Sequence, residues 1–183
     1  QRQMCIRDSS YYSDKSYGKL IGATGVISVV EQQDIHYYWN LFETDSDLSF
    51  DLANTTVSTI NSNNYTPDLF SINGFTYPNT NTDSLGHVVQ NVGDTIYISI
   101  INSGNMDHTL HFHGYHVQLL DIKVNKKQQG WSKDTFPVKI GEAMTVKLIP
   151  HQAGMYPVHD HNLINVTNAG GYPGGMLTVL EIQ

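Results

Sequence analysis

The sequence predicts an all-β protein built as a Greek-key β-sandwich. Runs rich in β-branched and aromatic residues recur along the chain, with Gly, Asn, Asp or Pro between them. Gly, Asn, Thr, Ser and Tyr are abundant, which is typical of β proteins with many turns. No window of helical length repeats its apolar residues every ~3.6 positions, although the segment SDLSFDLANT could hold a short turn.

The expected strands define four segments of the chain. The strands are the runs at 25–31, 35–43, 87–91, 94–102, 116–124, 134–140, 143–150 and 175–182. Their spacing predicts a C-terminal sandwich domain over 68–183, preceded by a first strand and connection at 35–67. We expect residues 17–34 to be the tail of a preceding domain. Residues 1–16 differ from the rest in composition and periodicity, so we expect them to be extraneous or disordered.

Charge and composition limit the classes of partner. The formal net charge of -7 argues against nucleic acid, because phosphate binding needs a basic surface. The chain lacks an apolar run of about 18 residues, so no membrane span is expected. It begins with Gln and shows no signal segment, so we expect a processed product or a fragment. Cys5 is the only cysteine, which excludes a disulfide within the chain.

Two His-x-His pairs are the strongest sign of chemistry. His111 and His113 form one pair, and His159 and His161 form the other. Residues i and i+2 of a strand project from one face about 6.5–7 Å apart, so each pair can offer two imidazoles to a metal. By the same parity, His108 and Asp160 should project from the opposite face. The chain therefore predicts a four-histidine face and, behind it, a second polar pocket.

The motifs around these histidines resemble a known family. They are NSGNMDHTLHFHGYHVQLLD, then DTFPVKIGEAMTVKLIPHQAGMYPVHDH, and a closing GGMLTVLEI. Together they resemble the C-terminal cupredoxin, or plastocyanin-like, domain of multicopper oxidases of the laccase or two-domain type. The resemblance implies a cupredoxin-like sandwich with copper as cofactor. It also implies that GVISVVE is the last strand of a preceding cupredoxin domain.

The resemblance also implies roles for individual residues. His111, His113, His159 and His161 correspond to ligands of a type 2/type 3 trinuclear copper cluster, which reduces dioxygen to water. His108 and Met176 correspond to ligands of a type 1 copper. Asp160 stands where the family has the type 1 cysteine, and Asn165 where it has a further histidine.

This departure predicts that the domain has no type 1 copper, because a blue copper site needs a thiolate. We expect the vestigial pocket to be filled by hydrogen bonds among His108, Asp160 and Asn165, or with water. The alternative is a redesigned metal site in which Asp160 and His108 are the ligands.

The preferred functional hypothesis is one half of an oxidoreductase. Another cupredoxin domain, in the same chain or in a neighbouring subunit of a homotrimer, would complete the cluster and carry the type 1 copper. The fragment alone is then expected to be inactive; its partners would be dioxygen and a small reducing substrate, in a periplasmic or extracellular location. The alternatives are a non-catalytic module for a single copper or zinc ion, a nitrite-reductase-like enzyme, and a degenerate structural domain.

Overall fold

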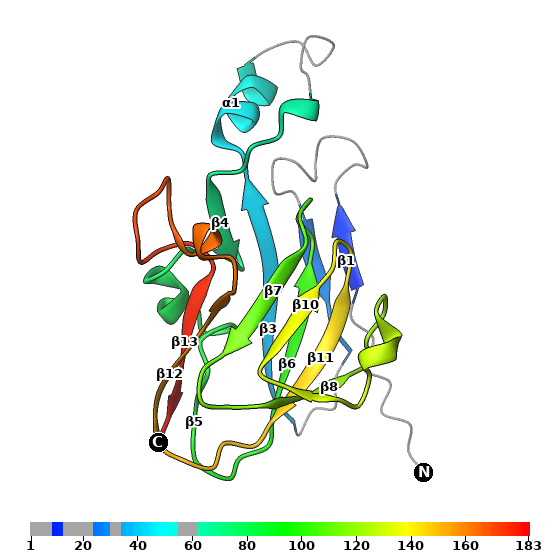
Figure 1. The fold of residues 1–183 in the computed structure, drawn as a ribbon, viewed down its shortest axis with the longest axis vertical. Helices are drawn as coiled ribbons and strands as arrows, with labels where there is room; N and C mark the ends of the chain where they lie inside the picture. Colours follow the sequence, from blue (N-terminus) through cyan, green and yellow to red (C-terminus); the bar gives the residue numbers. More distant parts are fainter. Residues whose placement is uncertain (1–8, 13–23, 30–33, 55–61) are drawn as a thin grey trace.

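The protein is a two-layer β-sandwich, as the all-β prediction requires (Figure 1). The structure, a computed structural model, describes residues 9–12, 24–29, 34–54 and 62–183. One layer has five strands: β10 (Thr135–Val138), β7 (His108–Phe112), β12 (Gly154–Asp160), β13 (Leu177–Ile182) and β5 (Val89–Gln90). The other has six: β4 (Leu69–Ile72), β3 (Ile35–Thr44), β6 (Ile96–Asn102), β11 (Ala143–Leu148), β8 (Val117–Leu120) and β9 (Ser132–Lys133). Short 3-10 turns occur at η2 (Ser62–Asn64), η3 (Asn79–Thr82), η4 (Lys126–Gln128) and η5 (Leu163–Val166).

The core lies between the two layers and follows the alternation of each strand. On β7, His108, Leu110 and Phe112 are buried, whereas Thr109 and His111 are less so. Trp39 of β3 stacks on Phe112 with ring centroids 5.7 Å apart, so aromatic packing joins the two sheets.

The strand β3 belongs to the sandwich although it precedes residue 68. It pairs in parallel with β6 and antiparallel with β4, at the edge region of the six-stranded sheet. The predicted first strand is thus an integral part of the core. The sandwich therefore uses 35–44 as well as the segment 68–183.

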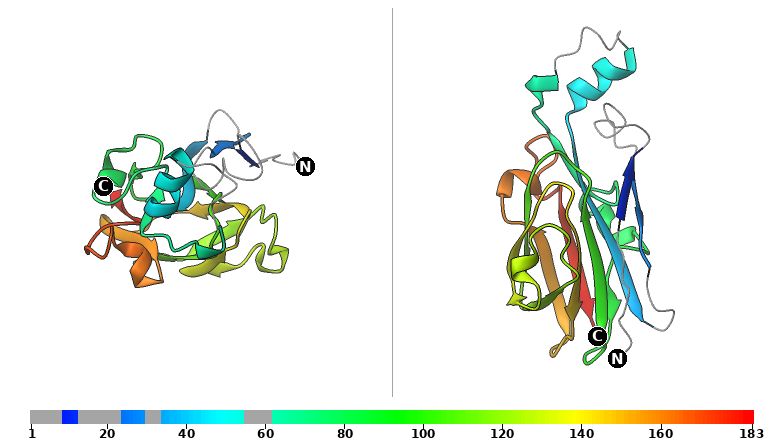
Figure 2. Two further views of the ribbon diagram at one scale, coloured as in Figure 1. Left: turned by 90° about the horizontal axis from the view of Figure 1, so that it is seen from above. Right: turned by 90° about the vertical axis from the view of Figure 1, so that its right-hand side faces the viewer.

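The N-terminal region contains a pair of short strands, one of which lies within residues 1–16. Ser9–Tyr12 form β1, which pairs antiparallel with β2 (Thr24–Ile27). Strand pairing, which composition does not reveal, satisfies backbone groups of these four residues. The interpretation of residues 1–16 as extraneous or disordered sequence remains a prediction. Side views place β1 and β2 outside the six-stranded sheet (Figure 2). Just after β2, the Ser28 hydroxyl lies 3.2 Å from the Ser99 hydroxyl of β6, so a hydrogen bond joins this segment to the six-stranded sheet.

A helix replaces the short turn that the sequence suggested. The helix α1 spans Ser46–Asn54 and lies beyond one end of the sandwich (Figure 1). Asp45 caps it, since its Oδ1 accepts a hydrogen bond from the Leu48 backbone N–H at 2.8 Å. Only Leu48 of the helix is buried, which explains the weak apolar periodicity. Across the described part of the chain, no helix has the length and apolar character needed to cross a bilayer.

Candidate metal centre

The two His-x-His pairs come together on the outer surface of the five-stranded sheet. The strands β7 and β12 are neighbours, and their register places His159 directly opposite His111. His113 and His161 follow the ends of the same two strands. The His161 backbone N–H donates to the Thr109 carbonyl at 2.7 Å, which holds the chain beside β7 beyond the ladder.

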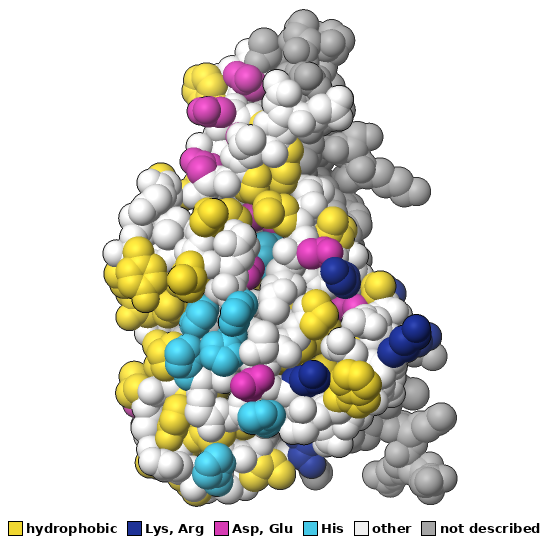
Figure 3. Space-filling model, viewed as in Figure 1, with side chains coloured by type: hydrophobic (Ala, Val, Ile, Leu, Met, Phe, Trp, Pro, Cys, Tyr) yellow, Lys and Arg dark blue, Asp and Glu magenta, His cyan; other side chains and the backbone are white. Residues whose placement is uncertain are grey.

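The four imidazoles form one cluster, which we call the histidine face. The ring of His111 lies 4.7 Å from that of His113 and 5.6 Å from those of His159 and His161, measured between centroids. The His113 and His161 side chains are exposed, and histidines gather in an open patch of the surface (Figure 3). Parity therefore predicted correctly which residues of the two strands project outward.

Hydrogen bonds orient two of these rings. Nδ1 of His159 lies 2.8 Å from the backbone carbonyl oxygen of Asp160, an acceptor, so Nδ1 carries the proton. The lone pair is then on Nε2, which faces Nε2 of His113. Nδ1 of His111 lies 2.7 Å from the Thr135 hydroxyl. Nε2 of His111 takes no part in this hydrogen bond. Such bonds on the far nitrogen are how proteins orient metal-binding histidines.

The donor set fits a metal such as copper. Nε2 of His113 and Nε2 of His159 are 3.0 Å apart. This is roughly the separation of two nitrogens bound to one ion at about 2 Å each. Burial lowers the pKa of His113, and the neighbouring His111 and His159 lower it further. The neutral, metal-binding form of His113 is therefore favoured.

The histidine face is nevertheless an incomplete site. Among the residues that the structure describes, no three His, Cys, Asp or Glu side chains converge on a single point. The four imidazoles instead spread over the surface, and two of them are exposed.

Behind the histidine face lies a buried polar cluster. His108 is 1% exposed, and its Nδ1 lies 2.7 Å from Oδ2 of Asp160. The same oxygen accepts a hydrogen bond from Nδ2 of Asn165 at 2.8 Å. The expected mutual hydrogen bonding of these three side chains is thus present. Met176 is fully buried beside them, and its backbone N–H donates to the Asn165 carbonyl at 2.9 Å.

The cluster contains a carboxylate that sequence reasoning missed. Oε2 of Glu43, on β3, lies 3.0 Å from Nε2 of His108. Its other oxygen accepts hydrogen bonds from the Asn105 backbone N–H and from the Tyr65 hydroxyl. Burial and the charge of Glu43 raise the pKa of Tyr65, so Tyr65 stays a donor. We call Glu43, His108 and Asp160 the buried triad.

The buried triad has His108 between two carboxylates. The carboxylates approach opposite nitrogens of the ring, so they do not meet at one point where a metal could bind both. Because ionised carboxylates only accept, both ring nitrogens donate and His108 is an imidazolium. Burial lowers the pKa of His108, but the hydrogen bonds to Asp160 and Glu43 outweigh it and raise the pKa to about 9 from 6.5.

This pKa predicts a loss of stability in alkaline solution. A histidine whose pKa is raised on folding stabilises the fold fully below its unfolded value of 6.5, and the contribution is lost as the pH rises through about 9. We expect the free energy of unfolding of the copper-free protein to fall on the order of 2 kcal/mol across this window. Urea unfolding at a series of pH values measures it. A His108→Gln variant should show a flatter profile, and an equally steep profile would contradict the assignment.

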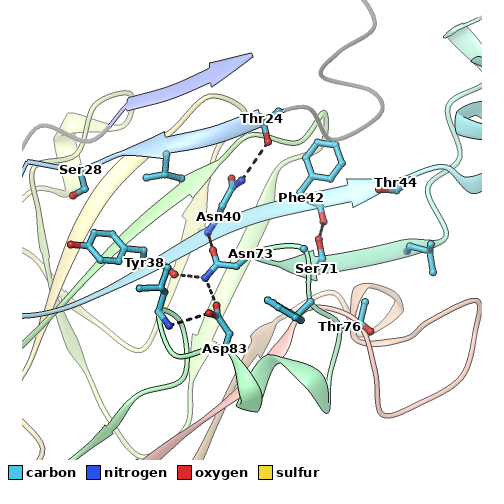
Figure 4. A pocket seen from close by; sticks show the side chains of 15 residues that line it. Thr24, Ser28, Tyr38, Asn40, Phe42, Thr44, Ser71, Asn73, Thr76 and Asp83 are labelled. Atoms are coloured by element: carbon cyan, nitrogen blue, oxygen red, sulfur yellow. Dashed lines mark hydrogen bonds between the residues drawn. The ribbon is translucent and has the colours of Figure 1, made fainter. Parts of the chain in front are cut away.

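A separate hollow lies on the opposite side of the sandwich. It encloses about 780 Å³ between β2 and the outer face of β3 and β4. Asn73 organises its wall, since its amide donates to the Tyr38 carbonyl and to Asp83, both at 2.6 Å (Figure 4). The lining contains no histidine or cysteine among the described residues.

Comparison with known proteins identifies the family of this domain. A family model described as multicopper oxidase matches residues 49–171. No curated protein matches the sequence.

Solved structures show the same fold. The blue copper oxidase from Nitrosomonas europaea superposes with a TM-score of 0.77 at 19% identity, over 98% of this chain and 57% of that one. The multicopper oxidase mgLAC gives 0.76 at 21%, over 97% and 56%. The copper nitrite reductase from Nitrosomonas europaea gives 0.67 at 18%, over 96% and 62%. The chain thus spans just over half the length of these oxidases, and the cupredoxin-like sandwich is confirmed.

Proposed function

This chain belongs to the multicopper oxidase family, and we propose that it supplies four ligands to a type 2/type 3 trinuclear copper cluster. The ligands are His111, His113, His159 and His161. The observation that supports this role is the register of β7 and β12, which sets His159 opposite His111 and gathers four imidazoles on one open face. The family implies copper, which imidazole suits as a ligand.

When bound, copper would supply the one-electron chemistry that reduces dioxygen to water. The protein's part is to present neutral imidazoles in a fixed orientation. The backbone carbonyl of Asp160 and the hydroxyl of Thr135 do this for His159 and His111. The lowered pKa of His113 keeps that ring available for metal near neutral pH.

We assign the type 1 copper to a different domain. The buried triad and Asn165 fill the corresponding pocket with hydrogen bonds, and Asp160 offers no thiolate. We therefore expect the copper-loaded chain to lack the intense visible absorption of a blue copper site. Spectra of the isolated chain, recorded at equal copper content before and after reduction, test this. An intense blue band that disappears on reduction would contradict the assignment.

The partner is another cupredoxin domain, in the same chain or in a neighbouring subunit such as that of a homotrimer. Two large apolar side chains that closely follow His161 in the chain support such a contact: Leu163 and Ile164 are 65% and 69% exposed. Apolar surface of this kind is typical of interaction sites. A small reducing substrate supplies the electrons, and the location is periplasmic or extracellular.

Copper stoichiometry separates this proposal from a second candidate. The close Nε2 atoms of His113 and His159 also favour a module that binds a single ion without oxidase activity. The cluster requires a trinuclear complement of copper at each site shared with the partner domain, whereas the module requires a single ion per chain. Metal analysis of the intact protein distinguishes them.

Substitution of a ligand completes the test. His159→Ala should reduce the copper content of the intact protein to below about half, because a cluster that loses one of its imidazole ligands would bind its ions weakly. His116→Ala is the matched control, because His116 is exposed and lies outside the histidine face. Equal copper contents in the two variants would contradict a role for His159 as a ligand.

A further inference from the structure

We propose that Asp160 is a positioning residue for the copper ligands His159 and His161, and that Glu43, on the facing sheet, holds Asp160 in place through His108. This inference rests on the proposed function, since it concerns the same ligands. Its physical basis is a continuous set of hydrogen bonds that starts on one sheet and ends at a ligand ring on the other.

The Asp160 carboxylate joins the start of β7 to the turn that follows Asp160 itself. Its Oδ2 accepts from His108 at the start of β7 and from Asn165 in η5. Its Oδ1 accepts from the Asn162 backbone N–H at 2.9 Å. The side chain is 1% exposed, so water does not replace these donors. The conformation of the chain at Asp160 is therefore fixed by its own side chain.

The backbone of Asp160 transmits this constraint to the ligands. Its N–H donates to the Met176 carbonyl at 3.1 Å, and its carbonyl accepts from Nδ1 of His159 at 2.8 Å. The second bond selects the tautomer of His159 that leaves Nε2 free for metal. His161 is the next residue, so its position follows from the same backbone.

Glu43, on the six-stranded sheet, supports Asp160 through His108, which lies beside Asp160 on the five-stranded sheet. Glu43 packs against Gly104, where a Cβ would have no room, and is bonded by Asn105 and Tyr65. Held in this way, Glu43 fixes His108 through Nε2 at 3.0 Å, and His108 fixes Asp160 through Nδ1 at 2.7 Å. Glu43 is thus two hydrogen bonds away from the residue that sets the ligand geometry.

Asp160→Asn tests the proposal with little change of shape. An amide cannot accept at both ends, so it loses either the Asn162 contact or the contacts with His108 and Asn165. In the copper-free protein, imidazole 15N chemical shifts report the tautomer of His159. We expect the wild type to hold the Nδ1–H form and Asp160→Asn to populate both forms.

Glu142→Gln is the matched control for destabilisation. Glu142 is also a fully buried carboxylate, and it accepts three backbone N–H groups, from Lys123, Val124 and Asn125. It bonds to no residue of the buried triad or the histidine face in these contacts. The control should keep the wild-type tautomer of His159 although its fold is weakened. The proposal is overturned if Asp160→Asn keeps the wild-type tautomer, or if Glu142→Gln loses it equally.

Copper affinity of the intact protein is the second measurement. We expect Asp160→Asn to weaken it about 10–100-fold, the usual effect of removing a group that orients a metal ligand. Glu43→Gln should weaken it less and in the same direction, and it carries the test if Asp160→Asn does not fold. An unchanged affinity and tautomer in Glu43→Gln would remove Glu43 from the proposal. Failure of the wild type to bind copper would refute the proposed function, while the tautomer measurement would still decide the role of Asp160.

Discussion

Replacing His108 with alanine is expected to lower the free energy of unfolding by about 3–5 kcal/mol, the usual cost of breaking a buried ion pair from one side. The His108 side chain is 0% exposed and lies between Glu43 and Asp160, which are themselves buried. Its removal leaves two carboxylates that face neither a cation nor solvent. Urea unfolding of the copper-free protein near neutral pH measures the loss.

The pH dependence of the variant separates charge from packing. Carboxylates left without their partner in a buried site have raised pKa values, so protonation relieves their cost. The deficit of His108→Ala relative to the wild type should therefore shrink as the pH falls. His116→Ala, at an exposed position, should cost within about 0.5 kcal/mol. A deficit for His108→Ala as small as that of His116→Ala would show that the buried triad contributes little to stability.

The side chains of β7 and β12 that face outward, and those that face the core, could be predicted from the sequence. Side chains of a strand alternate between its two faces. His108 is three positions before His111, so it faces the core if His111 faces outward. The same rule places Asp160 inward between two outward histidines. Burial along β7 and β12 follows this alternation. The prediction needed no knowledge of which strands are neighbours.

The pairing of distant strands could not be predicted in the same way. Whether His159 lies opposite His111 depends on the register of β12 against β7, which is set by the packing of the whole sandwich. The four-histidine face expected from parity presupposes that the two pairs meet, and the resemblance to a known family supported that assumption. The metal roles of the four histidines remain a prediction.

The burial of Glu43 could have been predicted from its position in its strand. It has the same parity in its strand as Trp39 and Leu41, which face the core. A carboxylate on an apolar face implies a buried partner. The partner itself, His108, is 65 residues away, and local sequence cannot identify it. The helix α1 was underestimated for the converse reason, because a capping aspartate and a single buried leucine give little periodicity.

Trp39→Ala is expected to lower the free energy of unfolding by about 3–5 kcal/mol, as large aromatic deletions in cores do. The Trp39 ring is 0% exposed, and its Nε1 donates to the Gly86 carbonyl at 2.7 Å. Trp39→Phe should cost less, because it keeps an aromatic ring against Phe112 and loses chiefly the hydrogen bond. Thermal and urea unfolding of the copper-free chain provide the measurement.

This substitution also tests where the domain begins. If 68–183 formed the sandwich alone, a change in β3 would unfold only a connection and leave the main transition in place. Because β3 pairs with β6 along its length and Trp39 packs on β7, we expect a single cooperative transition that shifts as a whole. Phe50→Ala, on the exposed side of α1, is the control and should shift it little. A main transition unchanged by Trp39→Ala would place the start of the domain after β3.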